Sequence, residues 1–479
     1  MSSDFSVPSS LPAKPALRRN YLAFPEVIAQ AVGGTAPSAV PAINVSIIFA
    51  VAGNGTWATF AFAAIAMLFL VAQMNVFSRR GATSGGLYVY AAKGLGPLMG
   101  VVAGWSFLIA YLFGEAFVFL CMIHISSALI HQMTGMSNSF MSGAALGVLG
   151  LALSWGIAYR DIKLSTRVTL AIEFATMSAI LFLIGFYFVH KGAVIDSAQL
   201  RLEGVGASRF RLGLVFAFLS FVGFESASTL GAEAREPLKT IPRALVSCIL
   251  IFSFFFCISG YGLVDAFHAA MPGLDKIDSP FMALAQSLGI GAFGTLVTVG
   301  VLTSFFACSM AIINAGSRVL YVFAHHGLIH SGGGKVHKDN ATPHIAITLF
   351  AALAFLLAFG LVASGVSVTD AMDYLGTVSS FGFLSCYILV AVGAPLYLKR
   401  RGELRAGHVA SAVIAVAMLA IPLFGSLYPV PEWPLNILPY VFLTLIALCV
   451  AHLFYMKRAN PGLLSAIEEE LLGDSAEED

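Results

Sequence analysis

FAFLSFVGFESASTLGAEAREPLKTIPR, residues 216–243, is the stretch that decides the fold of this chain. It begins as an apolar segment able to cross a bilayer, is interrupted near Ser220 and Gly223, and carries a lone acid, Glu225, at the interruption. A carboxylate at membrane depth is expensive, so it indicates a functional site that faces protein or water. Backbone that leaves the helix at that depth is tolerated only where protein buries it or where it lines a cavity. The stretch therefore predicts a broken helix with a site at its break.

The composition indicates an all-α polytopic membrane protein. Hydrophobic residues make up 58% of the 479 residues and charged residues 11%, whereas ordinary soluble domains carry about 25% charged residues. The mean hydropathy is +0.87. All six cysteines lie inside apolar segments, which favours small buried residues over a disulfide framework or a metal cluster. The sequence contains no phosphate-binding loop and no zinc-ligand spacing, so we predict neither enzymatic chemistry nor a nucleic-acid partner.

Twelve hydrophobic segments each approach or exceed the ~20 residues that a bilayer requires. They lie at roughly 22–51, 57–78, 96–130, 140–158, 167–189, 211–235, 242–265, 288–323, 344–364, 371–398, 408–427 and 436–456. The lipid bilayer is therefore the first partner that the sequence predicts.

Lysine and arginine are distributed unevenly between the two sets of loops. All but five of the 26 fall in the two tails and in the loops that share their side. The exceptions are Lys191, Arg201, Arg209, Arg211 and Lys276. Since cytoplasmic loops carry the excess of positive charge, we expect both termini to be cytoplasmic, in a plasma membrane or a bacterial inner membrane. The same distribution places no lysine or arginine deep in the bilayer.

The first hydrophobic segment also carries signs of a break. Gly33 and Gly34 are adjacent, and Pro37 and Pro41 follow within the same segment. Proline removes a backbone donor and clashes with the preceding turn, while glycine permits a non-helical path. A packing glycine pair with a simple proline kink would explain this segment alone. Two breaks in corresponding helices of two five-helix halves, however, indicate an inverted-repeat transporter.

This arrangement divides the chain into five parts. We predict a cytoplasmic N-terminal tail at 1–20, a first inverted repeat at 21–190 and a second at 208–400. Two accessory helices follow at 405–457, and an acidic tail at 458–479 is expected to be solvated in the cytoplasm.

Four stretches resemble the amino acid–polyamine–organocation (APC) transporters. Residues 216–245 are similar to the sixth-helix signature of that family, an aromatic-Gly-Phe-Glu run that leads to Ile-Pro-Arg-Ala. SGGLYVY at 84–90 resembles the loop before the third helix, and residues 159–165 resemble the entry to the fifth. Residues 314–343 resemble the eighth helix and its loop. The resemblance covers about residues 20–400 and implies a five-plus-five inverted repeat around a central substrate site.

The resemblance also implies which residues hold the substrate. A substrate carboxylate would meet backbone amides of the first break, here at Gly33, Gly34, Thr35 and Ser38, where the family's usual Gly-Ser-Gly-Ile-Phe run is replaced. An amino group would meet carbonyls of the second break, at Ser220, Phe221, Val222 and Gly223. Helix N-termini favour anions and C-termini favour cations, which agrees with both assignments. Phe221 is a candidate gate, and Tyr111, Ser379 and Ser380 are further pocket candidates.

Three acidic residues are candidates for charge recognition or coupling. Glu225 is either a switch that holds one access state or a structural acid. Similarity to amine-transporting members places Glu115 beside the substrate side chain. Glu173 lies one turn before Thr176. Thr176 resembles the position at which some proton-coupled members of the family carry a lysine. Because that lysine is absent, coupling falls to a proton on Glu173, to sodium held by hydroxyls such as Thr303 and Ser304, or to substrate exchange.

We therefore expect a secondary active transporter that moves amino acids or related small amines by alternating access, with proton coupling preferred. A polyamine or ethanolamine-type permease and a substrate exchanger are alternatives, and a nutrient sensor that binds without transport is an alternative of another class. H⁺ or Na⁺ as coupling ion is the only cofactor considered, and no metal site is predicted. The sequence does not predict the oligomeric state.

Overall fold

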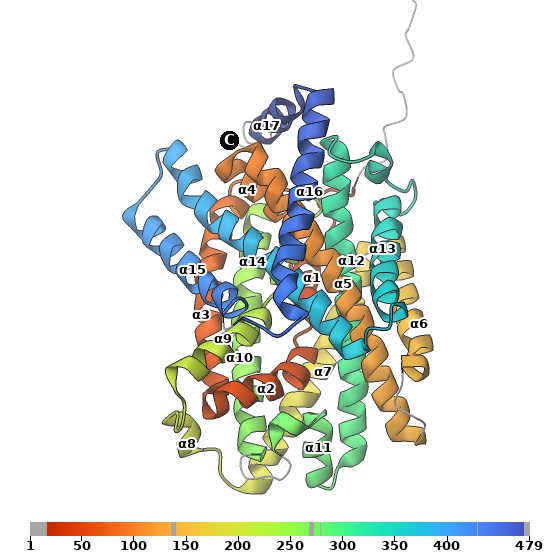
Figure 1. The fold of residues 1–479 in the computed structure, drawn as a ribbon, viewed down its shortest axis with the longest axis vertical. Coiled ribbons are helices and arrows are strands. Elements are labelled where there is room, and N and C mark those ends of the chain that lie inside the picture. Colours follow the sequence, from red (N-terminus) through yellow and green to blue (C-terminus); the bar gives the residue numbers. More distant parts are fainter. Residues whose placement is uncertain (1–16, 136–139, 268–272, 278, 429, 474–479) are drawn as a thin grey trace, which may run out of the picture.

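A computed structural model describes residues 17–473 with the exception of 136–139, 268–272, 278 and 429. Within these ranges the chain is helical (Figure 1). The one β-bridge of the described residues joins Leu22 to Ala234. The α-helices are α1 Phe24–Thr35, α2 Ala39–Ala52, α3 Thr56–Ser78, α4 Leu87–Leu95, α5 Pro97–Thr134, α6 Phe140–Arg160, α7 Ile162–Lys191, α8 Ser197–Leu200, α9 Ala207–Leu219, α10 Pro237–Phe267, α11 Pro280–Ser287, α12 Gly291–His325, α13 His344–Ala363, α14 Val368–Arg400, α15 Ala406–Gly425, α16 Leu438–Ala459 and α17 Leu463–Gly473. Five short 3₁₀ segments connect them, η1 Gly53–Gly55, η2 Phe224–Leu230, η3 Leu274–Lys276, η4 Ser331–Gly334 and η5 Leu435–Ile437.

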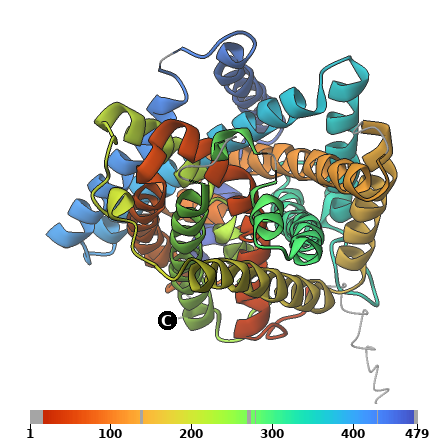
Figure 2. The same ribbon diagram turned by 90° about the horizontal axis from the view of Figure 1, so that it is seen from below.

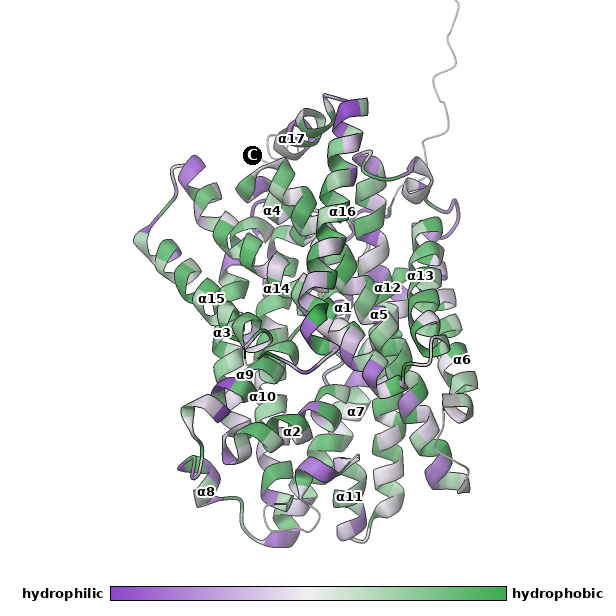
Figure 3. Ribbon diagram, viewed as in Figure 1, coloured by the Kyte–Doolittle hydropathy of each residue, from purple (hydrophilic) through white to green (hydrophobic). Residues whose placement is uncertain are grey.

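Eleven stretches of the described residues are long and apolar enough to cross a membrane. The first, Phe24–Ser78, is 55 residues long and contains the first two segments expected from the sequence. The all-α polytopic class is thereby confirmed, whereas the count of twelve and the inverted repeat stay predictions. Figure 3 agrees with this class, because hydrophobic residues dominate the middle of the bundle and many hydrophilic ones lie in the connections at its two ends.

The helices differ strongly in how much of their surface is buried. The most apolar stretch of α5 is more buried than that of any other candidate span among the described residues. α5 packs extensively against α14 and α12. The most apolar stretches of α15 and α16 are the least buried of the described spans. The blue segments that contain these two helices lie at the edge of the bundle in Figure 2. An exposed apolar helix suits a lipid-facing position. That the last two spans are accessory stays a prediction.

Two charged regions differ from the sequence-based picture. Arg318, which we counted with the loop cations although it falls within the segment 288–323, lies inside α12 and is fully buried. The acidic tail, expected to be solvated, contains α17, where Leu463 and Ile467 are 5% and 1% exposed. Both departures have the same cause, because a charged or amphipathic segment can be buried when a partner elsewhere in the chain satisfies it.

Candidate functional site

The first helix is interrupted where the sequence predicts a break. α1 ends at Thr35, and Ala36 adopts a left-handed conformation with φ of 51° before α2 begins at Ala39. The residue before a proline is disfavoured in the right-handed helical region, and Pro37 itself has no N–H to donate. The Ala36 N–H instead bonds the Gly33 carbonyl at 3.0 Å. The break therefore spans residues 36–38, whereas Gly33, Gly34 and Thr35, which were expected inside the break, still belong to the last turn of α1.

The second break follows α9, which ends at Leu219. Gly223 has φ of 105°, a conformation that favours glycine, and η2 starts directly after it. Ser220 supplies no free hydroxyl, because its Oγ donates to the Phe216 carbonyl at 2.7 Å. The inner half of this helix is thus a short 3₁₀ segment with Glu225 in its first turn.

The two breaks touch each other. A Cβ placed on Gly223 would lie 2.0 Å from the Gly34 carbonyl oxygen, and one placed on Gly34 would lie 2.5 Å from the Gly223 carbonyl oxygen. Two polar contacts reinforce this approach, since Ser226 Oγ donates to the Gln30 carbonyl at 3.0 Å and Asn44 Nδ2 donates to Ser220 Oγ at 2.7 Å. Gly33, Gly34, Thr35 and Ser38 are all buried here.

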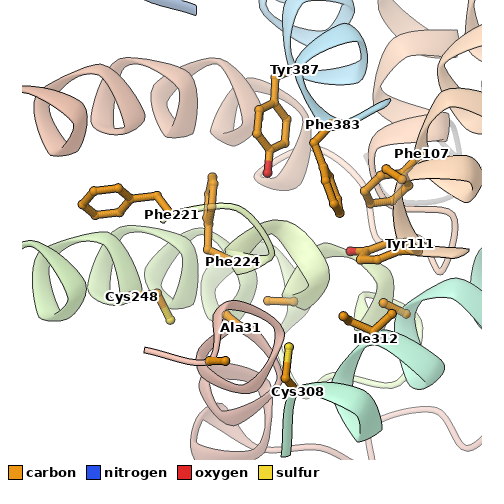
Figure 4. Packing of buried hydrophobic residues seen from close by; sticks show 14 of the residues in the cluster. Ala31, Phe107, Tyr111, Phe221, Phe224, Cys248, Cys308, Ile312, Phe383 and Tyr387 are labelled. Atoms are coloured by element: carbon orange, nitrogen blue, oxygen red, sulfur yellow. The ribbon is translucent and has the colours of Figure 1, made fainter. Parts of the chain in front are cut away.

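Glu225 is the centre of a buried hydrogen-bond network. Tyr111 Oη donates to its Oε1 at 3.1 Å, Tyr387 Oη donates to its Oε2, and the Gly223 N–H donates to Oε2 at 3.0 Å. Figure 4 shows both tyrosines pointing into the space between α5, α14 and the second break. The carboxylate thereby ties α5 and α14 to the unwound part of the sixth span.

Aromatic rings surround this network. Phe383 lies edge-on to Tyr111 at 5.3 Å between ring centroids, and Phe224 lies 6.2 Å from Tyr387 (Figure 4). Phe221, the predicted gate, is fully buried and packs on Phe256 at 5.2 Å. The sequence analysis missed Tyr387. The available signal was a tyrosine inside an apolar helix, since a buried phenol usually needs a hydrogen-bond partner.

Glu173 connects the first break to two other helices. Its Oε2 accepts the Ser38 N–H at 3.3 Å and the Ser38 hydroxyl at 2.7 Å, and its Oε1 accepts the Ser304 hydroxyl. α7, α12 and the break therefore meet on one carboxylate. Thr176 does not join them by a hydrogen bond, because its hydroxyl donates to the Ile172 carbonyl within its own helix. Thr303 likewise donates to carbonyls of α12.

Glu115 is fully buried, and only one of its two carboxylate oxygens accepts a hydrogen bond from a described residue. Ser309 donates to its Oε1, whereas Oε2 is buried with no hydrogen-bond partner among the residues that the structure describes. The neighbouring Cys308 Sγ lies 3.6 Å from the Gly34 carbonyl oxygen, which places this part of α12 beside the first break. An unsatisfied carboxylate oxygen in such a position is costly unless a proton or a cation accompanies it.

The remaining predicted residues are bonded to the backbone. Ser379 Oγ donates to the Ala110 carbonyl at 2.7 Å, which joins α14 to α5, and Ser380 Oγ donates to Gly376. The Val222 N–H donates to the Leu219 carbonyl at 3.2 Å, and Thr35 Oγ1 donates to Ala31. The Val222 and Thr35 bonds lie next to the two breaks, whereas the two serine hydroxyls bond within α14 or between α14 and α5.

A buried ion pair between α12 and the loop after η2 was not foreseen. Arg318 and Glu233, 0% and 1% exposed, form two hydrogen bonds, and Arg318 also donates to the Asn314 carbonyl at 2.9 Å. The Glu233 carbonyl accepts the N–H groups of Tyr21 and Leu22. The pair therefore links α12, the loop after η2 and the segment before α1. Over the described ranges no group of three potential metal ligands is found.

Comparison with known proteins places this geometry in a family context. Residues 26–428 match the family model for amino acid permeases. The branched-chain amino acid permease BcaP of Bacillus subtilis (strain 168) is 23% identical over 85% of this chain and 87% of its own length. The low-affinity putrescine importer PlaP of Escherichia coli (strain K12) is 27% identical over 69% and 72%. The human cationic amino acid transporter 4 is 23% identical over 75% and 57%.

Proposed function

We propose, because the chain belongs to the amino acid permease family, that it is a secondary transporter which moves amino acids or small amines by alternating access. The observation that carries the proposal is the meeting of two interrupted helices, at Gly34 and Gly223, beside three buried carboxylates. Helix ends exposed at a break present amides to anions and carbonyls to cations. The matched family and the relatives are permeases rather than enzymes.

Substrate binding between the breaks requires them to separate. The Gly34 and Gly223 backbones are in direct contact, so a zwitterion enters only when these two residues move apart. Its carboxylate would then meet amides that border the first break, such as the Ser38 N–H that now bonds Glu173, and its amino group would meet the carbonyls of residues 220–223. Glu225 is suited to sense this separation, since its partners Tyr111 and Tyr387 belong to other helices.

Coupling to protons is assigned in this proposal to Glu173. The carboxylate accepts three hydrogen bonds from Ser38 and Ser304, which lie on the break and on α12. Protonation replaces one acceptor site by a donor and removes the charge, so it weakens these bonds. Loading a proton would thereby release the first break from α7. Sodium coupling and substrate exchange are the competing outcomes of the transport test.

The proposed setting is a plasma membrane or bacterial inner membrane with both termini on the cytoplasmic side. The uneven distribution of lysine and arginine supports this orientation.

An amine or polyamine substrate is a second candidate, and Glu115 favours it. Its free Oε2 is an acceptor that an ammonium group could satisfy. The relative PlaP is named as a putrescine importer, and the relative BcaP as a branched-chain amino acid permease. A zwitterion with an apolar side chain leaves Glu115 unpaired, whereas a diamine brings a second cation to it.

The test is uptake into proteoliposomes after a thermal-shift screen of amino acids and amines. Saturable uptake driven by an imposed proton gradient is expected for at least one stabilising compound. Glu115→Gln separates the substrate classes, because it should weaken amine uptake far more than uptake of an apolar amino acid. Ser380→Ala is a matched control, since that hydroxyl donates only within its own helix. Binding without flux would contradict transport and support the sensor alternative.

A further inference from the structure

A hollow outside the transport site lies where α12 ends and α13 begins. Its volume is about 580 Å³, and most of its lining residues carry basic or imidazole side chains. The lining consists of His325, Gly334, Lys335, Val336, His337, Lys338, Asp339 and His344. Two lysines outnumber the single aspartate, so the hollow has a positive formal charge even with every histidine neutral.

The connection that carries these residues is fixed to the rest of the fold. Asn340 Nδ2 and Thr342 Oγ1 both donate to the Tyr159 carbonyl, at 3.2 and 2.7 Å. The His337 N–H donates to the Thr342 carbonyl at 2.9 Å, and the Ala341 N–H returns to the His337 carbonyl at 3.0 Å. The walls of the hollow are therefore built by a hydrogen-bonded loop that is anchored to the end of α6.

The hydrogen bonds of the His337 ring determine which of its two nitrogens carries the proton. His337 Nδ1 accepts the backbone N–H groups of Asp339 and Asn340, both at 3.3 Å. An imidazole nitrogen that accepts carries no proton, so in the neutral ring the proton resides on Nε2. His337 consequently offers an Nε2–H donor, and the rings of His337 and His344 lie 5.4 Å apart.

The two lysines add unpaired positive charge. Lys335 and Lys338 are exposed, and neither forms an ion pair with any residue that the structure describes. The N-terminus of α13 also faces this region, and its cap residue Pro343 makes no side-chain hydrogen bond to the first turn. Lysine ammonium groups and the positive end of a 20-residue helix both favour an anion.

The surroundings of the hollow are those of a membrane–water boundary. Tyr159 lies 5.5 Å from the His337 ring and 5.7 Å from Trp155, whose Nε1 donates to Thr348 on α13 at 3.0 Å. Tryptophan and tyrosine concentrate at membrane interfaces. Beyond this level α13 exposes Leu349, Leu353 and Leu356, so an apolar surface continues from the hollow along the helix.

We propose that this hollow binds the phosphate group of an anionic ligand, through Lys335, Lys338 and the His337 Nε2–H. Basic pockets beside membrane helices suit phosphate headgroups. The exposed leucines of α13 favour an anionic phospholipid as the source of the phosphate, with a soluble phosphate compound as the other source. Asp339 opposes binding, which makes the charge balance of the hollow testable in both directions.

The first experiment measures phosphatidylglycerol retained by the purified full-length protein, using native mass spectrometry after reconstitution in mixed phosphatidylglycerol and phosphatidylcholine nanodiscs. The double variant Lys335→Gln/Lys338→Gln should bind phosphatidylglycerol about tenfold more weakly. Asp339→Asn should bind it more tightly, because the substitution removes a negative charge from the hollow. It should leave the loop intact, since the hydrogen bonds of Asp339 are made by its backbone N–H and carbonyl. Lys399→Gln/Arg400→Gln, a pair of exposed cations at the end of α14, is the matched control and should bind like the wild type.

The second experiment separates the two sources of phosphate. In pure phosphatidylcholine nanodiscs, inorganic phosphate is titrated against chloride at equal ionic strength while the melting temperature is followed. A shift that the Lys335/Lys338 variant loses, without selective lipid retention, would assign the hollow to a soluble phosphate compound. The proposal is overturned if neither ligand distinguishes that variant from the wild type, or if the Lys399/Arg400 control loses as much binding. Equal melting temperatures of the variants without ligand exclude unfolding as the cause.

Discussion

The carbonyl oxygen of Gly34 lies so close to the α-carbon of Gly223 that a methyl group at Gly223 would fall 2.0 Å from it. Gly34 belongs to the last turn of α1, and Gly223 precedes η2, so the contact joins the two interrupted spans directly. Real Cβ atoms do not approach an oxygen this closely, and the neighbouring atom is backbone rather than a flexible side chain. Glycine at both positions is therefore a condition for the breaks to meet.

Gly223→Ala should separate the breaks and impair transport. The substitution adds a steric clash with Gly34 to the strain of a side chain at φ of 105°. Overpacking and an unfavourable backbone conformation each cost about 1–3 kcal/mol. We expect a lower melting temperature in detergent and at least a tenfold loss of substrate uptake, measured in proteoliposomes.

Two controls divide that effect into its causes. Gly192→Ala carries a positive φ of 73° but has open space around its Cβ, so it reports the conformational cost alone. Gly156→Ala, inside α6 with open space as well, should be neutral or slightly stabilising. If Gly192→Ala impairs uptake as strongly as Gly223→Ala, the contact between the breaks is not the reason.

Tyr387→Phe should weaken the network at Glu225 while keeping the aromatic packing. The carboxylate then loses one donor and keeps Tyr111 and the Gly223 N–H. Hydrogen bonds to a charged group contribute about 1.5–3 kcal/mol. We expect reduced uptake with a changed substrate affinity, measured as separate Km and maximal rate. Tyr397→Phe, at the far end of the same helix, should leave both values unchanged.

The fold was largely accessible from the sequence because its signals are local. Long apolar runs define the spans, and Pro37 and Gly223 mark the breaks through their own backbone preferences. A lone acid such as Glu225 stands out in an apolar run, and the structure places it at the second break as expected. These features need no knowledge of which helices are neighbours.

The partners of those acids were not accessible, since they depend on tertiary packing. Tyr387 reaches Glu225 from a position 162 residues away, and Arg318 reaches Glu233 across 85. Arg318 looked like a loop cation because its burial becomes favourable only when Glu233 is in place. Thr176 was selected by its alignment with a family lysine, whereas Glu173, one turn earlier, makes the contacts to Ser38 and Ser304.

Glu173→Gln should uncouple transport from the proton gradient. The amide cannot take up a proton in its place, yet it can still accept a hydrogen bond from Ser38 or Ser304. We expect exchange of labelled for unlabelled substrate to persist while gradient-driven accumulation is lost. Thr176→Val preserves shape and removes a hydroxyl that bonds only its own helix, so its accumulation should match the wild type. Undiminished proton-driven accumulation by Glu173→Gln would exclude this residue as the coupling group.

Arg318→Met and Glu233→Gln should each be strongly destabilising, and the double variant less so than their sum. Removing one partner leaves the other buried and uncompensated, at a cost of about 3–5 kcal/mol. Water cannot solvate the charge that remains, because the two side chains are 0% and 1% exposed. A double-mutant cycle on melting temperatures checks this. Additive effects would mean that the pair does not act as a unit.

The position of the C-terminal helix α17 predicts that it stabilises the end of the bundle that contains α4 and His326. Ile467 is 1% exposed, and Glu470 lies 3.6 Å from His326 Nε2, whose Nδ1 faces Tyr88 Oη at 2.6 Å. Burial, with a smaller effect of Glu470, raises the pKa of Tyr88, so its hydroxyl stays protonated beside His326 Nδ1. Ile467→Glu should therefore release α17, and hydrogen exchange should rise both in residues 463–470 and around Tyr88 in α4. Glu468→Gln, an exposed position on the same helix, should leave exchange unchanged in both places.

If Ile467→Glu raises hydrogen exchange in the tail alone, α17 packs on the bundle without stabilising α4. A parallel rise at α4 would mean that the tail stabilises the segment that leads into α5, the helix that carries Tyr111 and Glu115.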